Sequence, residues 1–500
     1  MRSSHFYNNL NTATLFWIKR CHRADREVIL NRIRLAELCP LRWTRLSPLT
    51  FVLLTQDLCW FSVCSTYRAA RFVQPVHPTA PFLQDTMSSQ VRLRLLPSAR
   101  CLFDEPIQVK VDGLRSRQVV TMRAKATDER GVVFRSYAIY RADVSGAVDL
   151  QRDPALCGSY VGVEPMGLLW SMKADTPHKY FHWSLALNPH MVKFSVHDGV
   201  AEEDGEGGAL AEAINERCLI ADGVSRVVVQ QETFRGVLFT PPGEGPFPGV
   251  LDLSTFASEK RASLLANKGF MVLTMAVFND KPANIKHLNL DYFKEGVQFL
   301  QQQPKVGGKG IGVISRSKGG DIGLSLSSFT SGVEAVVWIN GCSANIGYPL
   351  HYKNQQVLSV LGSNVSKVMP TPSGASIVKF GVGDPKTEEN KGSVVPIEKS
   401  KANFLFVASE DDLNWDSNAF MEDMVQRLKH EGKKNFEAVC YPRAGHLLEP
   451  PYGPYCYSGL HGILRAPVLW GGEPKAHINA EVHLWKKIED FFRTRLTSKL

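Results

Sequence analysis

Residues 311–320 read IGVISRSKGG, and the prediction of the fold starts from this stretch. Its first four residues are apolar, which predicts a buried strand. Beyond the turn, Ile322, Leu326 and Phe329 share one helical face, which predicts a helix. A serine at the tip of a sharp strand-to-helix turn is a nucleophile elbow, where the hydroxyl stands above the sheet. Ser317 is therefore the candidate nucleophile.

The surroundings of this serine agree with an elbow in one respect and depart from it in another. We expect the helix to begin at Lys318, so that its N–H groups and positive dipole end favour a developing oxyanion. The usual pattern is Gly-x-Ser-x-Gly, but Ser315 occupies the first glycine position. Serine is small enough for a strand and a helix that pack closely. Taken alone, the turn also fits a plain connection or a phosphate-binding loop.

A serine nucleophile needs a base, and the base needs a carboxylate that holds its tautomer. Asp411 and Asp412 follow the apolar run 404–408, and His446 follows the run 436–441. Sites in open α/β sheets form at the carboxyl ends of the strands. An Asp pair or a lone Gly-His is usually structural, but both occur here in the order Ser, Asp, His of α/β-hydrolases. The sequence therefore predicts a catalytic triad.

The second half of the chain alternates apolar runs with amphipathic segments. In the segment 290–303, Phe293, Val297 and Leu300 fall on one helical face. Apolar strands that alternate with helices imply a mostly parallel sheet covered on both faces. We predict an α/β-hydrolase domain over residues 226–497.

Residues 89–225 show a different pattern. Short alternating runs, such as 91–95, 107–111 and 192–197, are separated by Gly, Pro and Asp clusters. This pattern predicts an all-β, immunoglobulin-like antiparallel sandwich. Five hundred residues with 44% hydrophobic content are enough for two such packed cores.

Composition excludes several classes of function. The formal net charge is +9, but the first 86 residues hold eleven Lys and Arg against five Asp and Glu, and the remainder is nearly balanced. Without a clustered basic stripe, nucleic-acid binding is not expected. The ten cysteines form no CxxC pair and no Cys/His cluster typical of a zinc site. Scattered thiols favour a reducing compartment.

Each end of the chain has a feature that bears on targeting. Residues 1–88 are expected to be a poorly structured extension, either an Arg-rich mitochondrial presequence interrupted by prolines or a nonessential segment before Met87. The apolar stretch 46–64 contains Pro48 and Asp57, so we expect no transmembrane segment. The chain ends in the tripeptide that the peroxisomal import receptor reads. We therefore expect a peroxisomal protein, with mitochondrion or cytosol as alternatives; the tripeptide residues are Ser498, Lys499 and Leu500.

Further motifs occur in the sequence before and after the predicted triad residues. They are residues 163–170 (VEPMGLLW), 245–249 (GPFPG), 411–415 (DDLNW), 445–452 (GHLLEPPY) and 470–474 (WGGEP). In these motifs the chain resembles the family of type I acyl-CoA thioesterases and bile acid-CoA:amino acid N-acyltransferases. The resemblance extends from about Val91 to the C-terminus.

The resemblance implies a β-sandwich packed on a hydrolase domain, and cleavage of fatty or bile acyl-CoA through an acyl-enzyme. In the family pattern the second aspartate of the pair, here Asp412, is the triad acid. The conjugating members usually carry cysteine as nucleophile, so Ser317 favours water as the acceptor and hence a thioesterase. The alternatives are N-acyl transfer to glycine or taurine and a weakened acyl-CoA-binding protein. No metal or redox cofactor is expected, because coenzyme A is part of the substrate.

One loop departs from this family. The backbone N–H of Lys318 and a second N–H, from Ser254 or Thr255, are the candidate oxyanion donors. Residues 253–258 read LSTFAS, whereas the family has a longer, glycine-rich loop here. Loss of one oxyanion donor costs about 10²–10³ in turnover, so a misplaced loop predicts a slow enzyme.

Overall fold

The computed structural model describes residues 90–200, 208–279 and 285–497. The predicted extension 1–88 and the terminal tripeptide 498–500 lie outside these residues. The described residues belong to one compact unit, Asp85–Leu500. Among them, no helix is long and apolar enough to cross a membrane.

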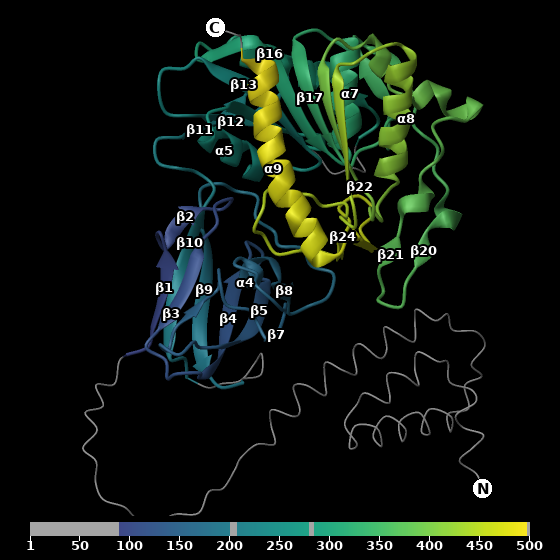
Figure 1. Ribbon diagram of the computed structural model, residues 1–500. Helices are drawn as coiled ribbons and strands as arrows, with labels where there is room; N and C mark the ends of the chain where they lie inside the picture. Colours follow the sequence, from purple (N-terminus) through teal and green to yellow (C-terminus); the bar gives the residue numbers. More distant parts are fainter. Residues whose placement is uncertain (1–89, 201–207, 280–284, 498–500) are drawn as a thin grey trace, which may run out of the picture. The chain divides into compact units, whose positions relative to one another are not determined.

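Two sheets make up the N-terminal part (Figure 1). Their neighbouring strands are antiparallel apart from β2 and β10, which run parallel. A short helix, α4 (Gly167–Trp170), also packs there. The first sheet holds β1 (Arg92–Leu96), β3 (Gln108–Asp112) and β6 (Val148–Asp149); the second holds β2 (Arg100–Leu102), β10 (Ala211–Cys218), β9 (His190–Asp198), β4 (Val119–Thr127), β5 (Val133–Arg141) and β7 (Cys157–Gly158), with β8 (Lys173–Ala174) paired to β5.

The alternation of buried and more exposed side chains along the strands explains how these two sheets share one core. On β3, Val109 and Val111 are buried while their neighbours are less so, and on β4 the buried residues include Met122 and Ala124. Side chains of both sheets belong to the same apolar cluster. Successive side chains of a strand point to opposite faces, so alternate residues meet in that core.

An eight-stranded sheet forms the C-terminal part (Figure 1). The strands from β14 to β23 are parallel, whereas β11 and β12 pair antiparallel. In spatial order they are β11 (Ser225–Gln230), β12 (Arg235–Thr240), β14 (Met271–Ala276), β13 (Phe247–Ser254), β16 (Val306–Arg316), β17 (Val333–Ile339), β22 (Asn403–Ser409) and β23 (Phe436–Tyr441).

Helices cover both faces of this sheet. One apolar cluster joins the strands to α6, α7 and α8, and a second joins them to α5 and α9. The predicted mostly parallel sheet with helices on both faces is confirmed, and the architecture is that of an α/β-hydrolase. The helices are α5 (Lys260–Asn267), α6 (Leu290–Gln301), α7 (Gly319–Phe329), α8 (Ser417–His430) and α9 (Pro474–Leu496).

Short strands form two smaller sheets beside the large one. The segment between β17 and β22 supplies most of them, together with the segment after His446. One sheet holds β15 (Leu288–Asn289), β18 (Leu350–Tyr352) and β19 (Gln355–Leu358); the other holds β20 (Met369–Pro370), β21 (Ser376–Ile377), β25 (Pro467–Leu469) and β24 (Ser458–Leu460).

Three predicted boundaries need correction. The helix expected over 290–303 ends at Gln301, and α7 begins at Gly319 with Lys318 as its N-cap. The loop expected over 253–258 is shorter, because Leu253 and Ser254 still belong to β13. Helix and strand ends are the least determined feature of a local pattern.

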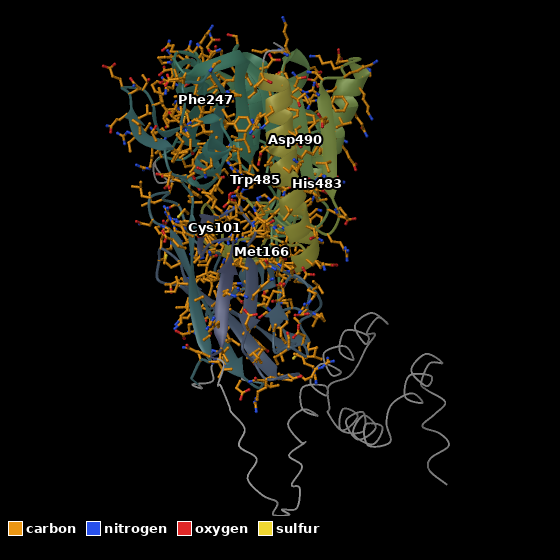
Figure 2. All side chains as sticks on the ribbon, turned by 60° about the vertical axis from the view of Figure 1, so that its left-hand side comes forward. Cys101, Met166, Phe247, His483, Trp485 and Asp490 are labelled. Atoms are coloured by element: carbon orange, nitrogen blue, oxygen red, sulfur yellow. The ribbon has the colours of Figure 1, made fainter. Side chains whose placement is uncertain are left out.

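Polar contacts connect the N-terminal part to α9 and to the end of α5. The indole Nε1 of Trp485, labelled in Figure 2, donates a hydrogen bond of 2.7 Å to Asp104 Oδ2. Lys268 forms an ion pair with the same oxygen at 3.1 Å. Asp104 is buried and therefore needs such partners.

Candidate active site

Ser317 lies at the tip of the turn between β16 and α7. Its φ is +57°, a left-handed conformation that a non-glycine residue adopts at a cost. The turn is held on both sides, because the Ser317 N–H donates to Ile339 O (3.0 Å) and the Gly320 N–H donates to Ser317 O (2.8 Å). The structure thus has the strained elbow that the sequence predicts.

The glycines after the serine are required by close packing. A Cβ at Gly319 would lie 2.7 Å from the carbonyl oxygen of Leu253, and one at Gly320 would lie 2.8 Å from Trp338 Nε1. Strand β13 therefore approaches the start of α7 more closely than any side chain permits.

Ser315 fits its unusual position. It is fully buried, and its Oγ donates to Val337 O at 3.2 Å. Across from it, a Cβ at Gly323 would lie only 2.9 Å from this Oγ. The missing side chain at Gly323 leaves the room that the serine hydroxyl takes.

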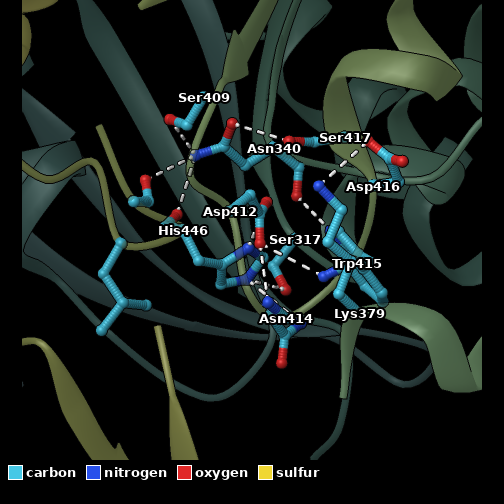
Figure 3. A network of polar contacts seen from close by, with 12 residues as sticks. Ser317, Asn340, Lys379, Ser409, Asp412, Asn414, Trp415, Asp416, Ser417 and His446 are labelled. Atoms are coloured by element: carbon cyan, nitrogen blue, oxygen red, sulfur yellow. Dashed lines mark hydrogen bonds and ion pairs between the residues drawn. The ribbon is translucent and has the colours of Figure 1, made fainter. Parts of the chain in front are cut away.

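The structure brings the three predicted triad residues together (Figure 3). His446 Nε2 lies 3.0 Å from Ser317 Oγ, and His446 Nδ1 lies 2.8 Å from Asp412 Oδ2. Asp412 and His446 are at most 1% exposed. With Nδ1–H donating to the carboxylate, Nε2 is free to accept the serine proton.

The two adjacent aspartates have different hydrogen-bond partners. Asp412 Oδ1 accepts the backbone N–H groups of Asn414 (2.9 Å) and Trp415 (3.2 Å), so both its oxygens are engaged at the triad. Asp411 Oδ2 instead accepts the backbone N–H of Gly472 at 2.7 Å. Only Asp412 contacts the histidine.

Asn340, which the sequence did not single out, connects the loops of the triad (Figure 3). It directly follows the buried strand β17 and has φ +43°. Its Nδ2 donates to Ser409 Oγ (2.9 Å) and to the carbonyl oxygen of His446 (2.9 Å). Its own carbonyl accepts from Trp415 Nε1 at 2.6 Å. The available sequence signal was its position directly after a buried strand, because Asp412 and His446 also follow buried strands.

Aromatic rings enclose the base. Trp470 stacks on His446 at a centroid distance of 5.5 Å, and Trp415 meets its edge at 5.6 Å. His461 stacks on Trp470 at 5.6 Å. Burial, with a contribution from nearby His446, lowers the pKa of His461 to about 4, so this ring is neutral at physiological pH. The motifs 411–415 and 470–474 contained both tryptophans.

The three candidate oxyanion residues, Lys318, Ser254 and Thr255, line the same cavity as Ser317 and His446. The close approach of Gly319 to Leu253 brings the end of β13 beside the start of α7. The expected donors are the backbone N–H groups of these residues and not their side chains.

Buried ion pairs fix both sides of that junction. The Lys318 ammonium pairs with buried Asp321, which also accepts the backbone N–H of Ile346 at 3.1 Å. On the other side, Arg261 of α5 pairs with buried Asp252 of β13 and donates to the carbonyl of Leu253 at 3.1 Å.

The cavity has a volume of about 710 Å³, and its charged and uncharged lining residues come from different segments of the chain. Residues 346–382 and 460–464 contribute no Asp, Glu, Lys or Arg to it. The charged lining comes from elsewhere. It consists of Arg130, Lys260, Arg316, Lys318, Glu449 and Glu481.

No cluster of three or more His, Cys, Asp or Glu side chains with the geometry of a metal site occurs in the described part of the chain. The site offers a hydroxyl, an imidazole and a carboxylate in hydrogen-bond contact. This is the arrangement of covalent acyl transfer through a serine.

Two family models match the chain. The model described as acyl-CoA thioester hydrolase/BAAT N-terminal region matches residues 104–231, and the BAAT/acyl-CoA thioester hydrolase C-terminal model matches residues 288–498. Acyl-coenzyme A thioesterase 3 of Mus musculus is 43% identical over 414 residues, which cover 81% of this chain and 94% of that protein. Acyl-coenzyme A thioesterase 2, mitochondrial, of Homo sapiens is 40% identical over 409 residues, 81% of this chain and 84% of that one. Among solved structures, acylaminoacyl peptidase of Pyrococcus horikoshii matches with a TM-score of 0.37 and 14% identity over 79% of this chain and 60% of that one.

Proposed function

The chain belongs to the acyl-CoA thioester hydrolase/BAAT family, where BAAT stands for bile acid-CoA:amino acid N-acyltransferase, and we propose that it is an acyl-CoA thioesterase. The observation that carries the proposal is the contact of Ser317, His446 and Asp412 in a cavity of about 710 Å³. Pockets for small-molecule ligands have this size.

In the acylation step, Ser317 attacks the thioester carbonyl while His446 Nε2 takes its proton. Asp412 holds the imidazole through Nδ1 and stabilises the imidazolium. The backbone N–H groups of Lys318 and of Thr255 or Ser254 donate hydrogen bonds to the oxyanion. The positive N-terminal end of the α7 dipole also stabilises its charge. Coenzyme A then leaves as a thiol with the proton from His446, and the acyl group stays on Ser317.

In the second step, water attacks the acyl-enzyme and releases the fatty acid. A serine nucleophile and relatives named acyl-coenzyme A thioesterase support water as the acceptor. The reaction as proposed needs no metal or redox cofactor.

The test is thiol release from a panel of acyl-CoAs, with and without glycine or taurine. Wild type should release coenzyme A and free fatty acid, and Ser317→Ala should be at least about 10³-fold slower, because no acyl-enzyme forms. An amide product in the presence of glycine or taurine would show N-acyl transfer instead. Binding of acyl-CoA with no burst of free coenzyme A would show a weakened acyl-CoA-binding protein, the alternative that the altered oxyanion loop motivates.

We propose the peroxisome as the site of action, because residues 498–500 read SKL and match the sequence read by the import receptor. Deleting them from a tagged protein should leave it outside peroxisomes, as followed by microscopy. Import of the shortened protein would refute the proposal, and import into mitochondria would assign the Arg-rich segment 1–88 as a presequence.

We also propose that residues 89–225 form an immunoglobulin-like domain and residues 226–497 the catalytic domain. The core shared by the two N-terminal sheets supports the first, and the start of the large sheet at Ser225 supports the boundary. No nucleic-acid partner is proposed.

A further inference from the structure

Arg130 lies in the turn between β4 and β5 of the N-terminal part, and the mechanism above does not use it. The residue is exposed and lines the cavity that contains Ser317. Residues 180–184, from the same part of the chain, also line this cavity. A section of the cavity lining therefore comes from the N-terminal part and carries a positive charge.

The other five charged residues of the lining each contact an oppositely charged group, an imidazole or an aromatic ring. These contacts are Lys318 with Asp321, Arg316 with Glu449 at 2.6 Å, Glu481 with His477 at 3.4 Å, and Lys260 with the ring of Phe103 at 4.4 Å from its centroid. Within the described part of the chain, the guanidinium of Arg130 has no hydrogen bond, ion pair or ring contact. Arg130 is thus the cation of the lining that remains available to a ligand.

The acidic residues beside Arg130 do not contact its guanidinium, because backbone N–H groups engage their carboxylates. Asp128 Oδ1 accepts the backbone N–H of Arg130 at 2.9 Å, and its Oδ2 accepts that of His182 at 3.1 Å. Glu129 Oε2 accepts the backbone N–H of Ser184 at 3.0 Å, and its Oε1 accepts that of the next residue at 3.1 Å. These hydrogen bonds hold the turn against the neighbouring segment of the lining.

Electrostatic effects place Arg130 close to this segment. Burial lowers the pKa of His182, and the charge of Arg130 lowers it further. Burial raises the pKa of Tyr180, and the charges of Arg130 and Arg316 oppose this rise. Tyr180 therefore lies near both cations, and Arg316 directly precedes the nucleophile Ser317.

We propose that Arg130 binds a phosphate group of coenzyme A, a role that rests on the proposed thioesterase function. The substrate has an apolar acyl end and a nucleotide end that carries several phosphate charges. Residues 346–382 and 460–464 contribute no charged side chain to the lining, so they suit the acyl chain. The phosphates need an unpaired cation elsewhere in the lining, which Arg130 supplies. Its planar guanidinium can donate two parallel hydrogen bonds to phosphate oxygens.

This role has a kinetic signature. The phosphates are separated from the thioester by the pantetheine arm, so their contact with Arg130 is the same in the ground state and in the transition state. Such an interaction lowers KM and leaves kcat unchanged. Because the residue is exposed, salt should weaken the contact by screening its charges.

The test compares two thioesters of the acyl group that wild type hydrolyses fastest. One is the acyl-CoA, and the other is the N-acetylcysteamine thioester, which lacks all phosphates. In Arg130→Gln, KM for the acyl-CoA should rise about tenfold, the effect of one charge-assisted hydrogen bond, while kcat stays within about twofold. The ratio kcat/KM for the N-acetylcysteamine thioester should stay within about twofold of wild type. Added salt should raise KM for the acyl-CoA more in wild type than in the variant.

Two further variants complete the design. Arg130→Lys keeps a cation without the guanidinium fork, so its KM for the acyl-CoA should rise less than in Arg130→Gln. Arg115→Gln is the matched control, because Arg115 is exposed in the same part of the chain, pairs with Asp198 and does not line the cavity. Its KM values should equal those of wild type.

Binding of coenzyme A alone provides a measurement that does not depend on turnover. Isothermal titration calorimetry should show about tenfold weaker binding by Arg130→Gln than by wild type. This comparison tests Arg130 even if the thioesterase proposal fails.

Equal losses with both thioesters in Arg130→Gln would overturn the proposal and make Arg130 a residue that supports the shape of the cavity. Unchanged KM for the acyl-CoA with unchanged affinity for coenzyme A would overturn it as well. A loss confined to acyl groups that end in a carboxylate would assign Arg130 to the acyl end instead. Full turnover of acyl-CoA by Ser317→Ala would refute the thioesterase mechanism itself, an outcome that is visible without any Arg130 variant.

Discussion

At the scale of single residues, the two adjacent aspartates show how position decides chemistry. Asp411 and Asp412 have the same side chain and neighbouring backbones, yet one contacts Gly472 and the other His446. The turn after β22 points their carboxylates to different partners. Position at a strand end gives only the pair, the family pattern favours the second aspartate, and the structure places Asp412 against the histidine.

This difference predicts opposite outcomes for two substitutions. Asp412→Asn should lower kcat by about 10³–10⁴, because an amide no longer fixes the Nδ1–H tautomer. Asp411→Asn should keep kcat within a few-fold, since its carboxylate faces Gly472. Thiol release at saturating acyl-CoA measures both, and similar losses in the two variants would contradict the assignment.

At the scale of elements, the packing of β16 against α7 accounts for the altered elbow. Ser315 on the strand and Gly323 on the helix occupy complementary space, because a Cβ at Gly323 would lie 2.9 Å from the serine oxygen. The usual glycine at position 315 is therefore replaceable as long as the helix carries no side chain opposite it. The pair acts as one packing unit.

The pair should behave non-additively in a double-mutant cycle. Gly323→Ala alone should destabilise the fold by about 1–3 kcal/mol, because it overpacks a buried contact. In the Ser315→Gly background the same change should cost less, because only the contact with Val313 Cγ1 at 3.3 Å remains and alanine favours a helix over glycine. Chemical unfolding of the four proteins gives the coupling, and purely additive effects would refute it.

Ser315→Gly itself should leave kcat within a few-fold of wild type. Its hydroxyl donates to Val337 O and does not line the cavity.

At the scale of the whole molecule, burial of histidines couples stability to pH. The ring of His190, on β9, packs against Phe181 and Trp183, with ring-centroid distances of 4.4 Å and 5.4 Å. Burial lowers the pKa of His190 to about 3. The pKa of His461 is lowered to about 4. Both histidines are neutral in the folded protein above these values, whereas in the unfolded chain they gain protons below about pH 6.5.

Stability should therefore be independent of these groups above about pH 6.5 and fall as pH decreases from there toward 4. The loss is about 1.4 kcal/mol per pH unit for each histidine, because the unfolded chain binds the additional proton. In His190→Phe, the decrease between pH 7 and pH 5 should be smaller by about 2 kcal/mol, as measured by urea unfolding at the two pH values.

The control is His430→Gln, on the exposed side of α8, which should retain the wild-type decrease. An unchanged pH dependence in His190→Phe would show that burial of this ring does not contribute.

The features that depend on local pattern could be predicted from the sequence alone. The elbow around Ser317, the apolar parallel strands and the positions of the aspartate pair and His446 follow from hydrophobic periodicity and from the rule that sites lie at strand ends, whereas the choice of Asp412 within the pair came from the resemblance to a known family. Element ends were less accurate, as at Ser254 and Gln301, because tertiary packing determines where a strand or helix stops.

Which groups meet became visible only in the folded structure. Asn340, Asn414 and Trp470 come from three separate loops, and no spacing in the sequence relates them to His446. The room that Gly323 leaves for Ser315 likewise depends on how a helix lies on a strand. Contacts between residues distant in the chain are set by the packing of the whole core, and a local pattern of side chains does not contain that information.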